Sequence, residues 1–240
     1  MTEHQFDNQL KAIFRTGSLF AIIVILGTLA DIVAGSILGG DLTAIPVTAA
    51  DRFAQFRENT LLGLYDLDLL NLTTALLMVP VFVSLFSALH KYHAPLAMLS
   101  LVIFIIGTAI FVANNSALPM LDLSHKFASS SDESVKMQIA AAGEAMLVKG
   151  AHGSLGVFPG FILINISEIL ISCIMLKTSI FSKTTAYAGV AGNSLLFIYI
   201  LLVTFIPAMK SIAMMIAGPG GLLTITWMIL FTVKLYKLGR

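Results

Sequence analysis

The sequence predicts an all-α protein, a polytopic transmembrane bundle of six helices with an amphipathic helix in an extracytoplasmic loop at 119–154. Hydrophobic residues make up 58% of the chain and charged residues 11%, and the mean hydropathy is +0.94. These values lie far outside the range of soluble domains. Several apolar runs are about 20 residues long, which is the length that crosses a bilayer as a helix. They lack the alternation typical of barrel strands, so helices must satisfy the lipid-facing backbone.

Six such runs, separated by polar or Gly/Pro-containing segments, define the predicted spans. They are 19–38, 67–89, 95–118, 155–177, 186–208 and 212–235. Together they form one integral membrane domain over residues 1–240, with no room for a soluble domain. The first run contains Asp31 and exceeds the apolar core of a signal peptide, so we expect it to be retained as a span.

The charged residues predict how the chain sits in the membrane and which partners it has. The formal net charge is +1, which gives no field for binding nucleic acid, so the lipid bilayer is the expected partner. Basic residues slightly favour the segments that share a side with the two chain ends. The positive-inside rule therefore predicts a multi-pass protein of the cell membrane with both termini cytoplasmic.

The loop at 119–154 is predicted to contain the amphipathic helix. In "SSSDESVKMQIAAAGEAMLVKG", Ser130 and Glu133 have capping-box spacing, and Gly150 can end the helix. One apolar stripe follows the helical period: Val135, Ile139, Ala142 and Met146. We expect this helix to lie on the membrane or to roof the bundle. The alternative is a hydrated connector with an apolar underside.

The other long loop, 39–66, is predicted to hold a short interfacial helix. In "TAADRFAQFRENTLLG", Phe53 and Phe56 share a face while Arg52 stays polar. At the end of this loop, Asp66 is the expected N-cap of the second span.

Carboxylates within spans are costly, so they are expected to face the bundle interior and to indicate a site. Asp31, Asp68 and Glu168 are of this kind. The predicted topology brings the outer halves of the first three spans to one polar cluster, which forms the candidate ligand-binding site with Glu168. The cluster contains Asp31, Asp68, Asn71, Asn114 and Asn115. A structural role is the alternative: Asp68 and Asn71 can join helices by hydrogen bonds, and the two later asparagines can end a helix.

Glu168 shares one helical face with Asn165 and Ser172, at i−3 and i+4. This face is expected to point inward, with Asn193 or Tyr199 as partners for the carboxyl group. Glu168 can then exchange protons or bind a ligand, or, when protonated, can simply bridge two helices.

Motifs that define a chemistry are missing from the sequence. It has no HExxH, no Walker loop and no nucleophile elbow, and it predicts no cofactor. "HKYH" at 90–93 is interpreted as a polar turn, since metal sites need three or four ligands. His125 and His152 with Asp122 and Glu144 could form an outer metal site, although their spacing does not require one. "GPGG" at 218–221 can kink the last span or open its backbone to a ligand.

Three stretches resemble a family of bacterial multi-pass membrane proteins catalogued as a domain of unknown function. They are "ENTLLGLYDLDLLNL", "ANNSALPML" and "GGLLTITWMILFTVKLYKLGR". The resemblance extends from about residue 14 onward, implies a six-helix bacterial inner-membrane protein, and implies no activity or functional residue.

The leading hypothesis is a non-catalytic protein that binds a small ligand, lipid headgroup or cation in the outer polar pocket. The second is a proton-coupled transporter that uses Glu168, with a weak echo between "LNLTTALLM" and "INISEILIS" as a possible repeat. The third is an intramembrane lipid hydrolase or transferase with Asp68 or Asp122 and His125 as acid and base. No nucleophile is distinguished, so the sequence favours a protein that is not an enzyme.

Overall fold

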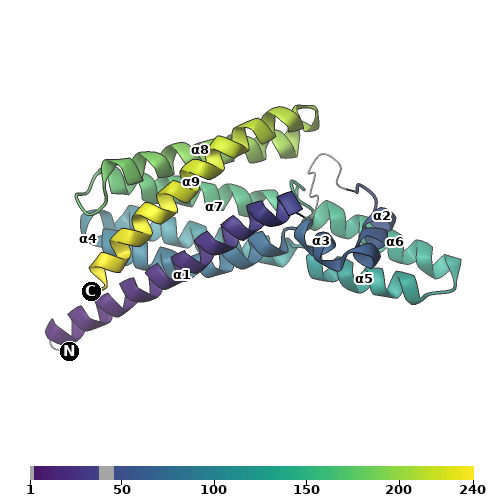
Figure 1. Ribbon diagram of the computed structural model, residues 1–240, viewed down its shortest axis with the longest axis horizontal. Helices are drawn as coiled ribbons and strands as arrows, with labels where there is room; N and C mark the ends of the chain where they lie inside the picture. Colours follow the sequence, from purple (N-terminus) through teal and green to yellow (C-terminus); the bar gives the residue numbers. More distant parts are fainter. Residues whose placement is uncertain (1–2, 38–45) are drawn as a thin grey trace.

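A computed structural model describes residues 3–37 and 46–240, and these residues form helices and connecting turns without any strand (Figure 1). The helices are α1 (Glu3–Ile37), α2 (Ala49–Glu58), α3 (Thr60–Tyr65), α4 (Leu69–Asn114), α5 (Ala117–Ser129), α6 (Glu133–Gly150), α7 (Phe158–Leu176), α8 (Lys183–Phe205), the 3-10 turn η1 (Pro207–Met209) and α9 (Lys210–Leu238). The predicted end of the first span, residue 38, lies outside the described residues.

Five helical segments of the described chain are long and apolar enough to cross a membrane. They are Asp7–Val33, Leu69–Ser129, Phe158–Leu176, Lys183–Phe205 and Lys210–Leu238. The chain is therefore a membrane-embedded, multi-pass, all-helical protein. The first helix begins well before the predicted residue 19, because the polar segment that precedes the apolar run is also helical.

Helix α4 covers two predicted spans and consists of two helices that meet at a kink. His93 has non-helical angles, φ −155° and ψ 71°. Pro95 follows, and a proline removes a helical donor and restricts the residue before it. The two arms run back along each other: the Asn115 Nδ2 donates to the Leu67 carbonyl at 2.8 Å, and the rings of Phe82 and Phe104 stack at 3.8 Å. The kink thus forms a helical hairpin.

The long helices close into a ring. α1 packs on α4, α4 on α7, α7 on α8, α8 on α9, and α9 packs back on α1. Gly17 and Gly27 of α1 lie against the first arm of α4, whereas Gly160 of α7 lies against Gly107 in the second arm. At the end with the termini, the Arg15 Nε donates to the Gly239 carbonyl at 2.6 Å and joins α1 to the end of α9.

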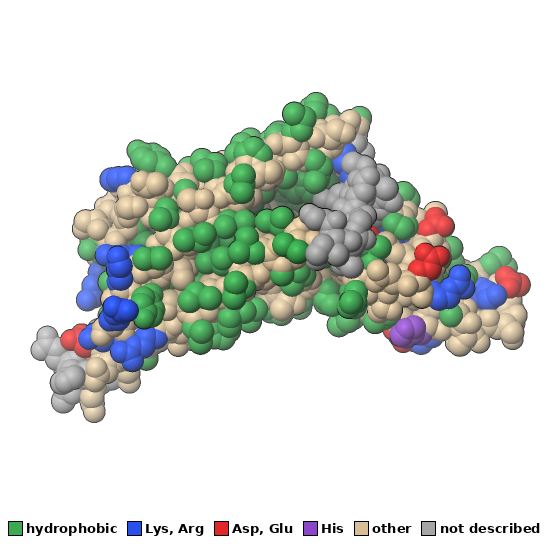
Figure 2. Space-filling view, in the orientation of Figure 1, with side chains coloured by type: hydrophobic (Ala, Val, Ile, Leu, Met, Phe, Trp, Pro, Cys, Tyr) green, Lys and Arg blue, Asp and Glu red, His purple; other side chains and the backbone are tan. Residues whose placement is uncertain are grey.

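The interior of the ring is packed at the end that carries the termini. Its largest fully buried side chains belong to one hydrophobic cluster: Trp227, Phe82, Phe104, Phe231, Leu85, Leu89, Ile171, Ile174 and Met175. The outer surface is apolar as well, with Leu26, Ile105 and Leu222 among its exposed side chains. Figure 2 shows hydrophobic side chains over the length of the ring, and Lys and Arg side chains gathered at the end with the termini.

The short helices α2, α3, α5 and α6 form a cap at the opposite end of the ring (Figure 1). A second hydrophobic cluster holds the cap together: Ala49, Phe53, Phe56, Leu67, Ala117, Met120 and Leu147. Helix α6 packs on α2 and α5, with Gly143 against Ala49 and Phe53. The two phenylalanines of α2 therefore face protein.

The cap corrects several details of the sequence analysis. Arg52 is buried rather than exposed, with 3% of its surface accessible. Asp132, not Ser130, caps α6 by accepting from the Ser134 N–H at 2.8 Å. Of the predicted stripe, Val135 and Ala142 are exposed. The buried face of α6 is instead Gly143, Leu147 and Gly150. Ile139 and Met146 of the predicted stripe do pack against the cap cluster. The helical period was predicted correctly, and the face that α2 and α5 bury overlaps the stripe only in part.

Candidate functional site

The half of the ring nearest the cap is hollow. A cavity of ≈ 720 Å³ lies between α1, α4, α7, α8 and α9. Its lining is mainly apolar and its floor includes Met78, Phe104 and Met228, which also belong to the packed cluster. Its ionisable side chains, apart from two tyrosines, are Asp31, Asp66, Asp68, His152 and Glu168. No Lys or Arg lies among the described lining residues, so the cavity is acidic.

A chain of hydrogen bonds crosses the cap end of the cavity. The Asp68 Oδ1 accepts from the Asn71 Nδ2 at 2.9 Å. The Asp68 Oδ2 lies 2.7 Å from the His152 Nδ1, and the His152 Nε2 lies 2.6 Å from the Tyr199 hydroxyl. Asp68 begins α4, His152 lies between α6 and α7, and Tyr199 lies in α8. The chain therefore joins three separate elements across the mouth of the ring.

Two residues with positive φ, Asp68 and Gly153, position the side chains of this hydrogen-bond chain. Asp68 has φ 61° and is the one non-glycine residue with positive φ in the described chain. Aspartate tolerates this left-handed conformation better than most residues, although it still costs about 1–2 kcal/mol. Gly153, directly after the histidine, has φ 73° and lies against Val203 of α8. It makes the turn that presents His152 to both partners.

The surroundings of His152 favour its protonated form. Burial lowers its pKa, but the carboxylate of Asp68 and the hydrogen bonds from both ring nitrogens outweigh this effect. The pKa of His152 consequently lies well above its ordinary value of 6.5. As an imidazolium, the ring donates to both the Asp68 carboxylate and the Tyr199 oxygen, so Asp68 is neutralised where it lies.

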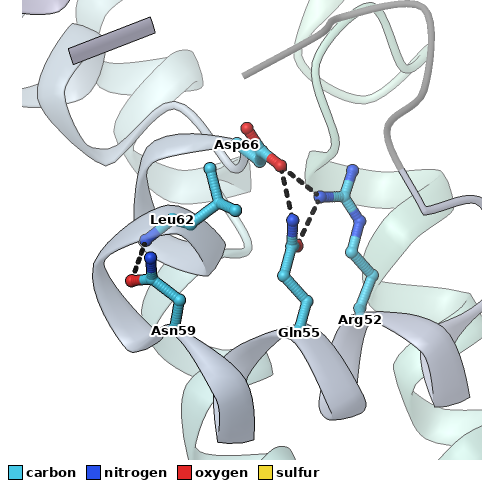
Figure 3. Close-up of polar contacts among 5 residues, drawn as sticks. All are labelled: Arg52, Gln55, Asn59, Leu62 and Asp66. Carbon is cyan, nitrogen blue, oxygen red and sulfur yellow. Dashed lines mark hydrogen bonds and ion pairs between the residues drawn. The ribbon is translucent and has the colours of Figure 1, made fainter. Parts of the chain in front are cut away.

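A second acid of the cavity, Asp66, is neutralised from the cap (Figure 3). Its Oδ2 accepts from the Gln55 Nε2 at 2.7 Å and lies 3.5 Å from the Arg52 Nη1. Burial lowers the pKa of Arg52, and Asp66 opposes that shift. Asp66 ends α3 and is not the N-cap predicted for the second span; Asp68 occupies that position. The Arg52–Gln55–Asp66 cluster fastens α2 to the mouth of the ring.

Tyr65 closes the cavity at the same level. Its hydroxyl donates to the backbone carbonyl of Asp31 at 3.3 Å and joins the cap to α1. Burial, and then the carboxylates of Asp31, Asp66 and Asp68, raise the pKa of Tyr65 to about 12. The phenol therefore remains a neutral hydrogen-bond donor.

Two carboxylates of the cavity, Asp31 and Glu168, have no hydrogen-bond or ion-pair partner for their side chains within the described chain. Glu168 is not hydrogen-bonded to either of the partners expected from the sequence, Asn193 and Tyr199. Asn193 instead donates to the Gly189 carbonyl and accepts from the Thr224 hydroxyl, and Tyr199 bonds to His152.

Asn165 is one helical turn before Glu168 and also lines the cavity. Only 7% of its surface is accessible. Its Nδ2 donates to the Phe161 carbonyl at 2.9 Å, but its buried Oδ1 accepts no hydrogen bond. An unsatisfied buried acceptor is costly, at about 1–3 kcal/mol. Asn165 and Glu168 together present two free acceptors to one cavity.

The residues expected to form the site thus separate into two groups. Asp31, Asp68, Asn71 and Glu168 line one cavity. Asn114 and Asn115 lie outside its lining: Asn114 donates to the Gly156 carbonyl at 3.0 Å, and Asn115 closes the α4 hairpin. These two asparagines hold the ends of helices in place, as the alternative interpretation proposed.

The two histidines of the outer loop, His125 and His152, lie in different surroundings. His125 is exposed on α5, where Asp122 pairs with Lys126 at 2.6 Å, and Glu144 accepts from the Ala49 N–H. These side chains do not converge with His152, and the described residues contain no group of three or more potential metal ligands. Sequence reasoning missed His152 and Tyr199 as partners of Asp68, because they come from a loop and a distant helix.

The wall formed by α9 is thin. Gly218 and Gly221 line the cavity, and a Cβ added to either would meet no atom within 4 Å. The helix continues through Pro219, so the "GPGG" sequence does not break the span. Its two glycines leave open space where side chains would otherwise fill the ring.

Fold and cavity define a membrane-embedded, multi-pass helical protein with a hollow, acidic interior at one end. The chain belongs to the family described as Domain of unknown function (DUF4386), whose model matches residues 15–234. Searches of the curated proteins and of the solved structures found no match.

Proposed function

We propose that this protein binds a small amphiphilic ligand in the cavity at the cap end of its ring, with Asp31, Asp68, Asn71 and Glu168 as the polar contacts. The observation that carries the proposal is the ≈ 720 Å³ cavity onto which these four side chains open. Mostly apolar cavities with a few converging polar groups are the usual form of small-molecule sites. The chain has no distinguished nucleophile, so binding is favoured over catalysis.

The proposed membrane arrangement has six passes, with both arms of α4 crossing the bilayer. The kink at His93 and the contact of Asn115 with Leu67 support this count, because they turn α4 into a hairpin. Lys and Arg side chains gather at the end with the termini (Figure 2). The positive-inside rule then makes both termini cytoplasmic in a bacterial inner membrane, and the cap and cavity extracytoplasmic.

Filling the cavity tests the proposal. In Gly221→Phe the new ring has open space to enter, so the fold should persist while the cavity is lost. We expect alkyl amphiphiles to raise the thermal midpoint of the wild-type protein in nanodiscs and to have no such effect on Gly221→Phe. Asp31→Asn and Asp68→Asn should weaken the protection. Equal protection of the wild type and the filled variant would contradict the proposal.

A second function, proton-coupled transport, is favoured by one observation: the Glu168 carboxyl group lines the cavity without a partner in the described chain. Ionisable side chains within the membrane mark proton pathways, and a membrane voltage drives protons along such a pathway. In potassium-loaded proteoliposomes treated with valinomycin, we would expect an internal pH change that Glu168→Gln abolishes. A flux that is the same in Glu168→Gln, or that protein-free vesicles reproduce, would rule this function out.

A further inference from the structure

The proposed function does not specify the chemical class of the ligand. The polar groups at the deep end of the cavity limit which class can bind there. At the cap end, Asp66 is paired with Arg52 and Asp68 with His152, whereas the Asp31 side chain has no partner among the described residues. The deep end differs, since Asn165 and Glu168 offer acceptors without any donor among the described residues. A ligand that satisfies both groups must bring its own N–H or O–H donors.

The charge of the cavity favours a cation for that role. Of the described lining residues, none is Lys or Arg, whereas four are carboxylic acids and two of these are neutralised by basic partners. A charged carboxylate within an apolar cavity is best stabilised by a cation that also donates hydrogen bonds. An alkylammonium group does both, because it carries a positive charge and up to three N–H donors.

The side wall of the cavity indicates where the apolar part of such a ligand goes. Ile32 of α1 and Leu222 of α9 line the cavity, and each is largely exposed, by 52% and 67%. α1 and α9 diverge from their contact at Arg15 and Gly239 toward the cap (Figure 1). Counting helical rise from the cytoplasmic ends of the predicted spans puts both residues about 20 Å along spans of ~30 Å, inside the hydrocarbon layer.

The same count places Glu168 about 6 Å deeper toward the termini than this rim. We propose that the cavity is a site for a membrane-soluble alkylammonium compound, which enters between α1 and α9 and places its N–H donors on the free Asn165 Oδ1 and the Glu168 carboxylate. This inference rests on the proposed function and specifies its ligand. The tail then lies along the apolar wall with its end toward Ile32 and Leu222.

The test uses four probes with the same eight-carbon chain. Octylamine has charge and N–H donors, octyltrimethylammonium has charge without donors, octanol has a neutral donor, and octanoate has a negative charge. Apparent Kd values come from the concentration dependence of the thermal midpoint of the full-length protein in phosphatidylcholine nanodiscs. We expect the apparent Kd of octylamine to be lower than that of each other probe by a factor of about ten or more, because its hydrogen bonds to the site are charge-assisted.

One variant removes the charge of Glu168, a second removes the Asn165 acceptor, and each has a matched control. Glu168→Gln should weaken octylamine binding about tenfold or more, and Asn165→Leu about three- to tenfold. Asp122→Asn removes a carboxylate exposed on the cap. Asn193→Leu removes a buried asparagine outside the cavity lining, whose amide oxygen and nitrogen are both hydrogen-bonded. Neither control should change the preference for octylamine.

The outcomes separate this inference from the proposed function. If all four probes protect equally, and Gly221→Phe abolishes that protection, the cavity binds amphiphiles without selecting ammonium, and only this inference falls. Unchanged octylamine binding in Glu168→Gln overturns it as well. If no probe protects the wild type, both proposals are wrong.

Discussion

The two halves of the ring share their helices and their lipid-facing surface but differ inside. At the end with the termini, Trp227 and Phe231 are fully buried and meet edge to face at 4.8 Å. At the cap end the same helices surround a cavity lined by Glu168, Asn165 and Gly221. An apolar exterior is required along the whole span by the bilayer, so it does not separate the halves. The difference lies in the inward-facing residues and indicates that one half holds the fold while the other is kept open.

The largest expected effect lies in the packed half. Trp227→Ala removes a fully buried ring that touches α8 near Gly189. We expect it to lower the free energy of unfolding by about 3–5 kcal/mol, the range for deleting a buried aromatic side chain. Unfolding by SDS titration measures this loss. If Trp227→Ala lowers the free energy of unfolding less than a substitution in the cavity does, the packed half does not hold the fold.

A smaller loss is expected at the mouth of the hollow half. Asp68→Ala leaves the protonated His152 without its carboxylate partner and puts alanine in a left-handed conformation. Together these changes should lower the free energy of unfolding by about 2–4 kcal/mol. Asp68→Asn tolerates that backbone and keeps a hydrogen-bond acceptor, so its loss should be about half as large. The same SDS titration compares them, and equal losses would contradict the role assigned to the backbone.

Removing only the charge of His152 should have a weaker effect than deleting its partner. Its pKa is raised in the folded state, so the imidazolium stabilises the fold fully below its unfolded pKa of about 6.5. This stabilisation is lost as the pH rises through the higher folded pKa. The thermal midpoint of the wild type should therefore fall over this range more than that of His152→Gln. Parallel pH profiles would show that the pair with Asp68 does not form.

The two buried asparagines should respond in opposite directions. Asn193→Leu breaks hydrogen bonds to Gly189 and Thr224 and should destabilise by about 1–2 kcal/mol. Asn165→Leu removes an acceptor that has no donor, so it should be neutral or should stabilise by up to about 1 kcal/mol. A comparable loss in Asn165→Leu would show that its side chain is satisfied within the protein.

The smallest effect is expected from the open wall. Gly221→Ala adds a methyl group into free space within a helix, and alanine favours helices over glycine by about 0.5–1 kcal/mol. We expect a slightly raised thermal midpoint. A lowered midpoint would mean that the space beside Gly221 is filled.

The sequence contained most of the fold but only part of the site. The apolar runs predicted the spans within a few residues at α7, α8 and α9, because length and hydropathy decide what crosses a bilayer. The ring could not be predicted, because periodicity along one helix does not select its neighbours. Asp31, Asp68 and Glu168 were expected to face inward because a carboxylate facing lipid is costly. Their neighbours were not predictable, so His152 and Tyr199, which are far from Asp68 in sequence, were not found as its partners. Asn114 was assigned to the pocket because depth in the membrane was known and position in the plane was not.

Thiol accessibility tests the contrast between the two halves most directly. Cys173 is replaced by alanine, and cysteine is placed at Ala75, which lines the cavity on α4, or at Ala97, which is fully buried in the packed half of the same helix. In nanodiscs, a small cationic methanethiosulfonate should modify Ala75→Cys at least about tenfold faster than it modifies Ala97→Cys. At Ala75→Cys the cationic reagent should also react faster than its anionic analogue, because the cavity is acidic. Equal, slow modification at both positions would show that the cap end of the ring is as closed as the other.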